Sequence, residues 1–367
     1  MSKNIAFYIS NHGFGHASRN IQIIKTLLKL EEEITIHIKT AGPQLEFMRR
    51  HIGEDKRVCY YNEPTDVGLI LKEGTLLIDE EKLKQKISDF VESWDDLVDC
   101  EHEFFHQENI GLVIADICPW ALQAADEARI KSILITNFTW VEIYQEYLPE
   151  QLWDAYLQCY ELADKVLIYD VYQPALPTYN PEYEMVSLVC RQFEEEEVGA
   201  IKARYEQPIV MVSVGMSAEL KEEIDVSHLP YHFIVTPGLD VKGDNVTYLT
   251  PDTMNTQNYV AASTYVISKA GWSTVAEVLL SNRKCALLGR DTVAEDRTTI
   301  GILKERKQCI EIQTEDLLHM EEIIKRLEDF HYSFEHEYHN DDYEIAKKIL
   351  FAYPERRRRE WKKEQNN

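Results

Sequence analysis

The chain has 367 residues, of which 44% are hydrophobic and 10% aromatic, and its formal net charge at pH 7 is −25. This length exceeds what one ordinary hydrophobic core supports and predicts two folded domains. Phosphate backbones bind basic surfaces, so a chain this acidic is not expected to bind nucleic acid. The basic run at residues 356–359, with Lys362 and Lys363 beyond it, indicates at most a peripheral membrane contact.

The cysteines indicate the cellular compartment. There are seven of them, without a CxxC pair or a regular spacing. An odd count without a signal peptide is typical of the reducing cytoplasm. No apolar run reaches the length of about 18 residues that a membrane span needs. We therefore expect a soluble, cytoplasmic protein.

Short apolar runs rich in β-branched residues alternate with helical patterns, twice over along the chain. The first set covers residues 5–9, 34–38, 58–61, 112–115, 132–135 and 166–169. The second set covers residues 209–214, 232–235, 246–249, 265–267, 285–288 and 309–312. This alternation predicts an α/β protein with two Rossmann-like domains that face one another across a ligand-binding cleft.

The predicted domains are residues 1–195 and 196–335, followed by a C-terminal helix and basic tail at 336–367. The helix expected at 342–352 has apolar residues at helical spacing, and it should cross back onto the first domain. The acidic run at 194–197 is expected to be a solvated face. Residues 63–77, with Pro64 and two glycines, are expected to form a loop or lid near the cleft.

A glycine-rich turn follows the first strand. A dinucleotide site begins with G-x-G after a strand, but Ser18 stands at the third glycine position and no acid ends the second strand. We favour another interpretation, in which Gly13, Phe14 and Gly15 form a tight turn. That turn would leave the imidazole of His16 at the mouth of the cleft, where it suits a general base.

His16 needs a partner to be more than a polar surface residue, and Asp116 is the natural one. It follows the strand at 112–115 and should lie at the same sheet edge as His16. A carboxylate there would orient the imidazole and stabilise its protonated form. Asp116 could also cap the helix that begins near Pro119, and the two roles are compatible.

The second motif follows the strand at 265–267 and reads Lys-Ala-Gly-Trp-Ser-Thr-Val-Ala-Glu. Ser273 and Thr274 are natural N-cap residues for the helix after it. A helix N-terminus suits a phosphate, and Lys269 would add a positive charge. Glu277 could bind the hydroxyls of a ribose. The alternative is an ordinary strand–helix turn with a good cap.

This motif resembles the donor-binding signature H-C-G-W-N-S-x-x-E of plant small-molecule glycosyltransferases, which have the two-Rossmann GT-B fold. Gly271, Trp272 and Glu277 match by identity. Thr274 stands at the phosphate-binding serine, whereas Lys269 replaces the phosphate-binding histidine. The resemblance implies that the motif, including Ser273, binds a nucleotide sugar.

Other motifs resemble the glycosyltransferase-like half of plant L-arabinokinase and related bacterial proteins. They are G-F-G-H-A-S-R at 13–19, D-I-C-P at 116–119, T-N-F-T-W at 136–140 and R-D at 290–291. The resemblance implies that Gly215 lets the diphosphate approach and that Glu295 or Asp296, beside Arg290, binds the donor sugar. It makes residues 13–15 an acceptor-side loop and His16 the base. No kinase module follows, so sugar kinase activity is not implied.

Metal sites are not expected. His102, Glu103 and His106 form an HExxH string, but the string precedes a strand and should pack Phe104 and Phe105 inward, without a third ligand. No two aspartates stand two positions apart, as a metal-bound diphosphate would favour. The helix dipole and Lys269 would then stabilise the leaving group.

The sequence thus predicts an inverting, metal-independent glycosyltransferase of hexosyltransferase type, with a nucleotide sugar (UDP-sugar first among these) as co-substrate and no other cofactor. Its acceptor hydroxyl and oligomeric state are left open. A nucleotide-sugar hydrolase or 2-epimerase on the same fold is one alternative. A non-catalytic protein that binds sugar nucleotides is another.

Overall fold

The computed structural model describes residues 2–72, 77–171, 182–214, 220, 222–290, 293–333 and 335–354. Its contacts divide the chain into two compact units. The first unit comprises Met1–Lys72, Ile78–Val186 and Asp341–Asn367, while the second unit comprises Ser187–Asn340 together with the short segment Glu73–Leu77. The boundary expected at 195/196 thus falls inside the second unit, at the start of a helix.

The first unit is built on seven strands. They are β1 (Lys3–Ile9), β2 (Ile34–Thr40), β3 (Val58–Asn62), β4 (Leu112–Asp116), β5 (Lys131–Thr136), β6 (Lys165–Tyr169) and β7 (Tyr183–Val186). Its helices are α1 (Phe14–Leu30), α2 (Gly42–Ile52), α3 (Glu80–Glu92), α4 (Trp94–Gln107), α5 (Trp120–Glu127), α6 (Trp140–Tyr144), α7 (Glu150–Glu161) and α14 (Asp342–Ala352).

The sheet of the first unit is parallel, with the order β3-β2-β1-β4-β5-β6-β7. Its central strands consist of buried apolar residues because helices cover both faces of such a sheet. The order reverses between β1 and β4, and parallel α/β sheets bind ligands at such a switch point, beyond the carboxyl ends of the strands.

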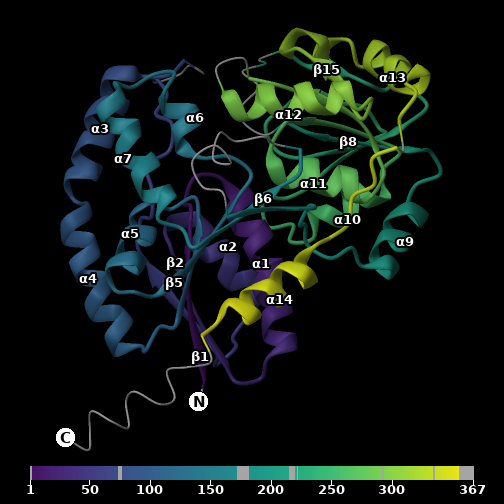
Figure 1. Ribbon diagram of the computed structural model, residues 1–367. Coiled ribbons are helices and arrows are strands. Elements are labelled where there is room, and N and C mark those ends of the chain that lie inside the picture. Colours follow the sequence, from purple (N-terminus) through teal and green to yellow (C-terminus); the bar gives the residue numbers. More distant parts are fainter. Residues whose placement is uncertain are drawn as a thin grey trace, which may run out of the picture. The chain divides into compact units, whose positions relative to one another are not determined.

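The C-terminal helix returns to the first unit, as the sequence predicts. Ile345, Ala346 and Ile349, which lie at the predicted apolar spacing, are buried, whereas Tyr343 at the same spacing is 50% exposed. Helix α14 packs against α1, and Figure 1 shows the two helices crossing. Gln22 on α1 donates a hydrogen bond to Asp342 at 2.9 Å, which fixes the start of α14.

The second unit has a six-stranded sheet and a two-stranded one. Its strands are β8 (Ile209–Ser213), β9 (Ile224–Asp225), β10 (His232–Val235), β11 (Val241–Lys242), β12 (Val246–Tyr248), β13 (Tyr265–Lys269), β14 (Lys284–Leu288) and β15 (Ile310–Ile312). Its helices are α9 (Glu195–Ala203), α10 (Thr256–Ala262), α11 (Trp272–Leu280), α12 (Ala294–Glu305), η2 (Thr314–Leu318) and α13 (Met320–Asp329).

The larger sheet of the second unit is also parallel, in the order β12-β10-β8-β13-β14-β15. Strands β9 and β11 pair with one another. The predicted α/β class, with two Rossmann-like domains, is therefore confirmed. Within the described ranges no helix is both long enough and apolar enough to cross a membrane.

Candidate active site

Helix α1 begins at Phe14, within the tight turn predicted for residues 13–15, and this changes the setting of His16. Gly13 is the N-cap, with a φ of 80° that favours glycine, and Phe14 is already helical. His16 therefore lies in the first helical turn and not in the loop. Its ring is largely buried, and the exposed apolar residue of this turn is Phe14, whose ring packs against Phe47.

Asp116 lies directly beside the start of α1. It is the last residue of β4, and it pairs in register with Ile9 at the end of β1. Its Oδ1 lies 2.8 Å from Nδ1 of His16, and its side chain is 1% exposed. His16 and Asp116, which the sequence places at one edge of the sheet, are thus within hydrogen-bonding distance of one another in the structure.

Two residues of α1 that sequence reasoning passed over complete this cluster. Nε and Nη2 of Arg19 donate to Asp116 at 2.8 and 2.5 Å, and Nη1 donates to Oδ1 of Asn137 at 2.5 Å. Asn20 donates to Asp116 Oδ2 at 2.5 Å. The helical spacing was the available signal, because residues three and four positions after His16 share its face of α1.

Asp116 is held as a carboxylate. Burial alone would raise its pKa, but the charge of Arg19 and then the contact with His16 outweigh burial and lower the pKa of Asp116 to about 2. The group is therefore an anion throughout the neutral range, able to orient the imidazole.

Residues 63–72, the first part of the expected lid, are held in place by hydrogen bonds, and we call this segment the wall. Asn11 Oδ1 accepts the Thr65 backbone N–H at 2.8 Å, and the Trp120 indole donates to the Thr65 carbonyl at 2.9 Å. Tyr144 donates to the carbonyl of Val67. Residues 63–72 follow β3 and are anchored in this way against the β1–α1 turn, whereas residues 73–76 lie outside the described ranges.

A second carboxylate, Asp66, lies in this wall. It accepts hydrogen bonds from the Asn11 backbone at 3.2 Å and from the Trp140 indole at 3.0 Å. Burial raises the pKa of Asp66, although a hydrogen bond with Ser10 and then the nearby His16 oppose the rise. Gly68 passes so close to His12 that a Cβ there would lie 1.8 Å from the imidazole Nδ1. A larger residue at this position would have to displace the His12 ring.

In the second unit, helix α11 begins at the glycine of the donor-like motif. Gly271 is the N-cap and makes no side-chain capping bond, so the expectation that Ser273 and Thr274 cap the helix is wrong. Both residues lie inside the first turn. The first intrahelical bond is donated by Val275 to the Gly271 carbonyl at 3.0 Å, so the three preceding amides face the helix start. This is a helix N-terminus suited to an anion.

Lys269 lies beside this N-terminus. It ends β13, and a Cβ on Gly271 would lie 3.4 Å from its Cε, so the side chain runs along the turn. Burial and the nearby Arg290 lower the pKa of Lys269, against the opposing effects of Asp296 and Glu295. Two cationic side chains, Lys269 and Arg290, therefore influence one another near the start of α11.

Glu277 is buried, with Arg191 as its partner. Arg191 Nη2 lies 3.2 Å from Glu277 Oε1, and the same guanidinium donates to Thr256 and to the carbonyl of Met254. Burial raises the pKa of Glu277, while Arg191 opposes the rise. Arg191 is a site residue that the sequence offered no signal for, since it lies far from the motif along the chain.

Two of the residues expected to bind the donor sugar, Arg290 and Asp296, are paired with one another. Arg290 donates to both carboxylate oxygens of Asp296, at 2.8 and 2.9 Å, and its backbone N–H donates at 3.0 Å. Asp296 is fully buried by these contacts, whereas Glu295 is half-buried. Gly215, expected to face the diphosphate, lies outside the described residues.

The HExxH string lies on α4. Phe105 is buried and His106 exposed, while His102 lies 3.8 Å from Glu127. Among the residues with described positions, no group of three or more His, Cys, Asp or Glu side chains is arranged to hold a metal ion.

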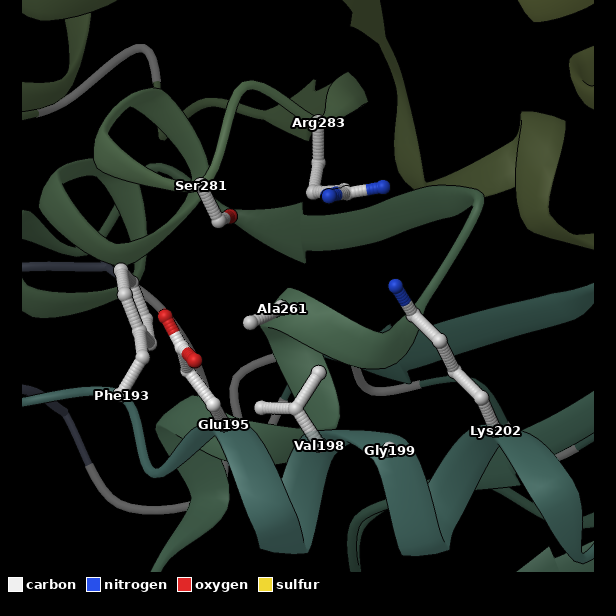
Figure 2. Close-up of a pocket in the computed structure, with 8 residues that line it drawn as sticks. All are labelled: Phe193, Glu195, Val198, Gly199, Lys202, Ala261, Ser281 and Arg283. Carbon is white, nitrogen blue, oxygen red and sulfur yellow. The ribbon is translucent and has the colours of Figure 1, made fainter.

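A groove of about 310 Å³ lies elsewhere in the second unit, between α9, α10 and the end of α11. Figure 2 shows the cationic ends of Lys202 and Arg283 on one side of it, with Glu195 and Phe193 on the other. The acidic run at 194–197 is only partly a solvated face, since Glu197 accepts a hydrogen bond from Asn258 at 2.5 Å. None of the predicted site residues lines this groove.

Solved structures of glycosyltransferases share the architecture over nearly the whole chain. Phytolacca americana UGT2, solved with UDP-2-fluoro-glucose and pterostilbene, aligns with a TM-score of 0.63 over 96% of this chain and 94% of that one, at 12% identity. Arabidopsis thaliana UGT89C1, solved with UDP-L-rhamnose, gives 0.60 over 95% and 94%, at 12% identity. The calicheamicin glycosyltransferase CalG4 gives 0.59 over 96% and 94%, also at 12%. The chain has the GT-B fold.

At this identity the structural similarities establish the GT-B fold and nothing finer. A distant sequence similarity links the GT-B chain to L-arabinokinase of Arabidopsis thaliana, with 27% identity over 143 residues. The match covers 39% of this chain and only 13% of that protein. No protein-family model matches the chain.

Proposed function

We propose that this protein is an inverting glycosyltransferase that moves a sugar from a nucleotide diphosphate-sugar, a UDP-sugar first among these, to an acceptor hydroxyl. The observation that carries the proposal is the hydrogen bond between His16 and Asp116 on a GT-B fold. An imidazole oriented by a buried carboxylate is a suitable general base for a hydroxyl. The relatives solved with UDP-2-fluoro-glucose and UDP-L-rhamnose support the choice of donor class.

In the proposed reaction, Nε2 of His16 takes the proton of the acceptor hydroxyl. The acceptor oxygen forms a bond to the anomeric carbon of the donor, while the bond from that carbon to the diphosphate oxygen breaks. The leaving diphosphate carries negative charge, which the amides at the start of α11 and the ammonium of Lys269 would stabilise. These groups occupy the role that a metal ion has in metal-dependent transferases.

The donor-binding roles follow the same proposal. Thr274 and Ser273, in the first turn of α11, would contact the phosphates, and Glu277 would bind the ribose hydroxyls. Asp296 would act through Arg290 by holding the turn that presents Glu295 to the sugar, because both of its oxygens accept hydrogen bonds from Arg290. Hexosyl transfer is the proposed reaction type.

The test begins with a panel of sugar nucleotides screened for thermal stabilisation, since ligands that bind the folded state raise its melting temperature. Sugar nucleotides that stabilise the protein are then assayed for release of the nucleoside diphosphate with and without hydroxyl acceptors. We expect acceptor-dependent release, and a His16→Gln variant that binds the donor normally but loses turnover by about a hundredfold or more. Full turnover in that variant would refute the assignment of the base, and release without any acceptor would indicate a hydrolase.

A further inference from the structure

Arg19 is a buried cation one helical turn after His16, and the proposed reaction does not yet use it. Its side chain is 1% exposed. Two of its nitrogens donate to Asp116 and a third donates to Asn137. Its guanidinium carbon lies 5.2 Å from the centre of the Tyr169 ring. These contacts fix a full positive charge beside the candidate base.

Nδ1 of His16 lies within hydrogen-bonding distance of one acceptor and one donor. Oδ1 of Asp116 and Nη2 of Arg19 are each 2.8 Å away. A guanidinium nitrogen only donates, so Arg19 can bond to Nδ1 only when Nδ1 carries no proton. In that tautomer the proton is on Nε2, which then cannot act as a base. In the other tautomer Nδ1 donates to Asp116, and Nε2 keeps its lone pair.

The two contacts of 2.8 Å are equal, and the proposed reaction requires the second of these tautomers. Nη2 of Arg19 already donates to Oδ1 of Asp116 at 2.5 Å. The contact of 2.8 Å between Nδ1 and the same Oδ1 is attractive only if a proton lies between the two atoms. Arg19 therefore holds the carboxylate where the ring N–H can reach it. In the same position its charge opposes a second proton on the ring, which Asp116 alone would favour.

The charged groups that face the ring come from three elements. Arg19 stands on α1, Asp116 ends β4, and Asp66 follows β3. The loop after β5 contributes the apolar ring of Phe138, 5.7 Å from the imidazole. Arg19 is the cation in this set, and it touches the ring and Asp116 at once.

We propose that Arg19 is a positioning residue that holds Asp116 within reach of the His16 ring and offsets the charge of Asp116, so that Nε2 can accept a proton. The inference rests on the proposed function, since it assigns Arg19 a part in making His16 a base. The reacting centre is then a His–Asp–Arg triple, in which the arginine sets the pH range over which the histidine works.

The test uses the full-length protein labelled with ¹³C at histidine Cε1, whose resonances report ring charge and tautomer without any substrate. His16→Gln identifies the resonance among the 12 histidines. In Arg19→Met, which removes the charge at similar length, the His16 resonance should titrate about one pH unit higher than in the wild type. The pH–rate profile of UDP release from UDP-glucose should show the same upward shift in the pH below which the rate falls. Arg19→Lys should keep the wild-type pH dependence on the acidic side of this profile. It should turn over more slowly, because one ammonium cannot span both Asp116 oxygens and Asn137.

The double variant Arg19→Met/Asp116→Asn decides the question even if Arg19→Met alone does not fold, because it leaves no buried charge unpaired. If the two charges offset one another, His16 should titrate in the double variant as in the wild type. A titration clearly below the wild type, or an Arg19→Met variant that titrates as the wild type does, would overturn the inference. The resonance is independent of turnover, so an Arg19 effect seen in a protein without transferase activity would refute the proposed function and leave the charge effect standing.

Discussion

Asp116→Asn is the most informative single change in the first unit, because the size of its effect can be worked out from the structure. The carboxylate is 1% exposed and accepts hydrogen bonds from His16, Arg19 and Asn20. Removing its charge leaves Arg19 buried without an anion, a change that costs about 3 to 5 kcal/mol of unfolding free energy. The expected variant is folded but clearly less stable.

The pH dependence of stability gives a second magnitude for the contribution of Asp116. The pKa of Asp116 falls from 3.8 to about 2 on folding, which corresponds to about 2 kcal/mol of stability. Because the folded pKa is the lower one, this stability is complete above the unfolded pKa and is lost as the pH falls through the folded pKa. About half of it remains at pH 3. The stability difference between the wild type and Asp116→Asn should therefore shrink by about 1 kcal/mol between pH 7 and pH 3.

Urea denaturation at both pH values measures this difference, with the fluorescence of Trp120 and Trp140, both buried in the first unit, as the signal. Asp126→Asn is the matched control, because Asp126 is exposed in the same unit and its change should cost less than about 0.5 kcal/mol. A difference that stays constant between the two pH values, or that is no larger than the control, would refute the reasoning.

Three further changes test the donor side and the wall. Lys269→Met should weaken UDP binding about tenfold in calorimetry at low salt and less at high salt. Because the pKa of Lys269 is lowered, the UDP affinity of the wild type should also begin to fall at a lower alkaline pH than an ordinary lysine would give. Equal affinities in wild type and variant would remove Lys269 from the site. Glu277→Gln should weaken UDP binding but not pyrophosphate binding, and a parallel loss of both would point to a structural role beside Arg191. Gly68→Ala should lower the melting temperature, since its Cβ meets His12; an unchanged melting curve would mean that the His12 ring moves aside without cost.

The sequence predicted the sheets well because their strands are continuous apolar runs. The expected runs coincide with β1 to β6 and with the strands of the larger second sheet, within a few residues. Strand β7 was missed because half of it faces outward, with Tyr183 at 44% and Met185 at 49% exposed. Strands β9 and β11 are two residues each and carry no periodicity.

The candidate site was predictable where topology alone brings residues together. Parallel strands end at one edge, so His16 and Asp116 could be paired from their positions after β1 and β4. The helix starts were less predictable. Ser273 is a good N-cap by residue type, yet the helix begins two residues earlier and Gly271, with an extended backbone, takes that place. Long-range partners such as Arg191 of Glu277 leave no trace in local spacing.

The return of α14 to the first unit has a consequence for biosynthesis. Its buried face packs on α1, and Thr26 and Gln22 both donate to Asp342, yet some three hundred residues separate these partners along the chain. While the ribosome is still translating the second unit, the matching surface of α1 has no cover. That face of α1 can be covered only once residues 342–352 have been translated, so this part of the first unit forms after the second unit has been made.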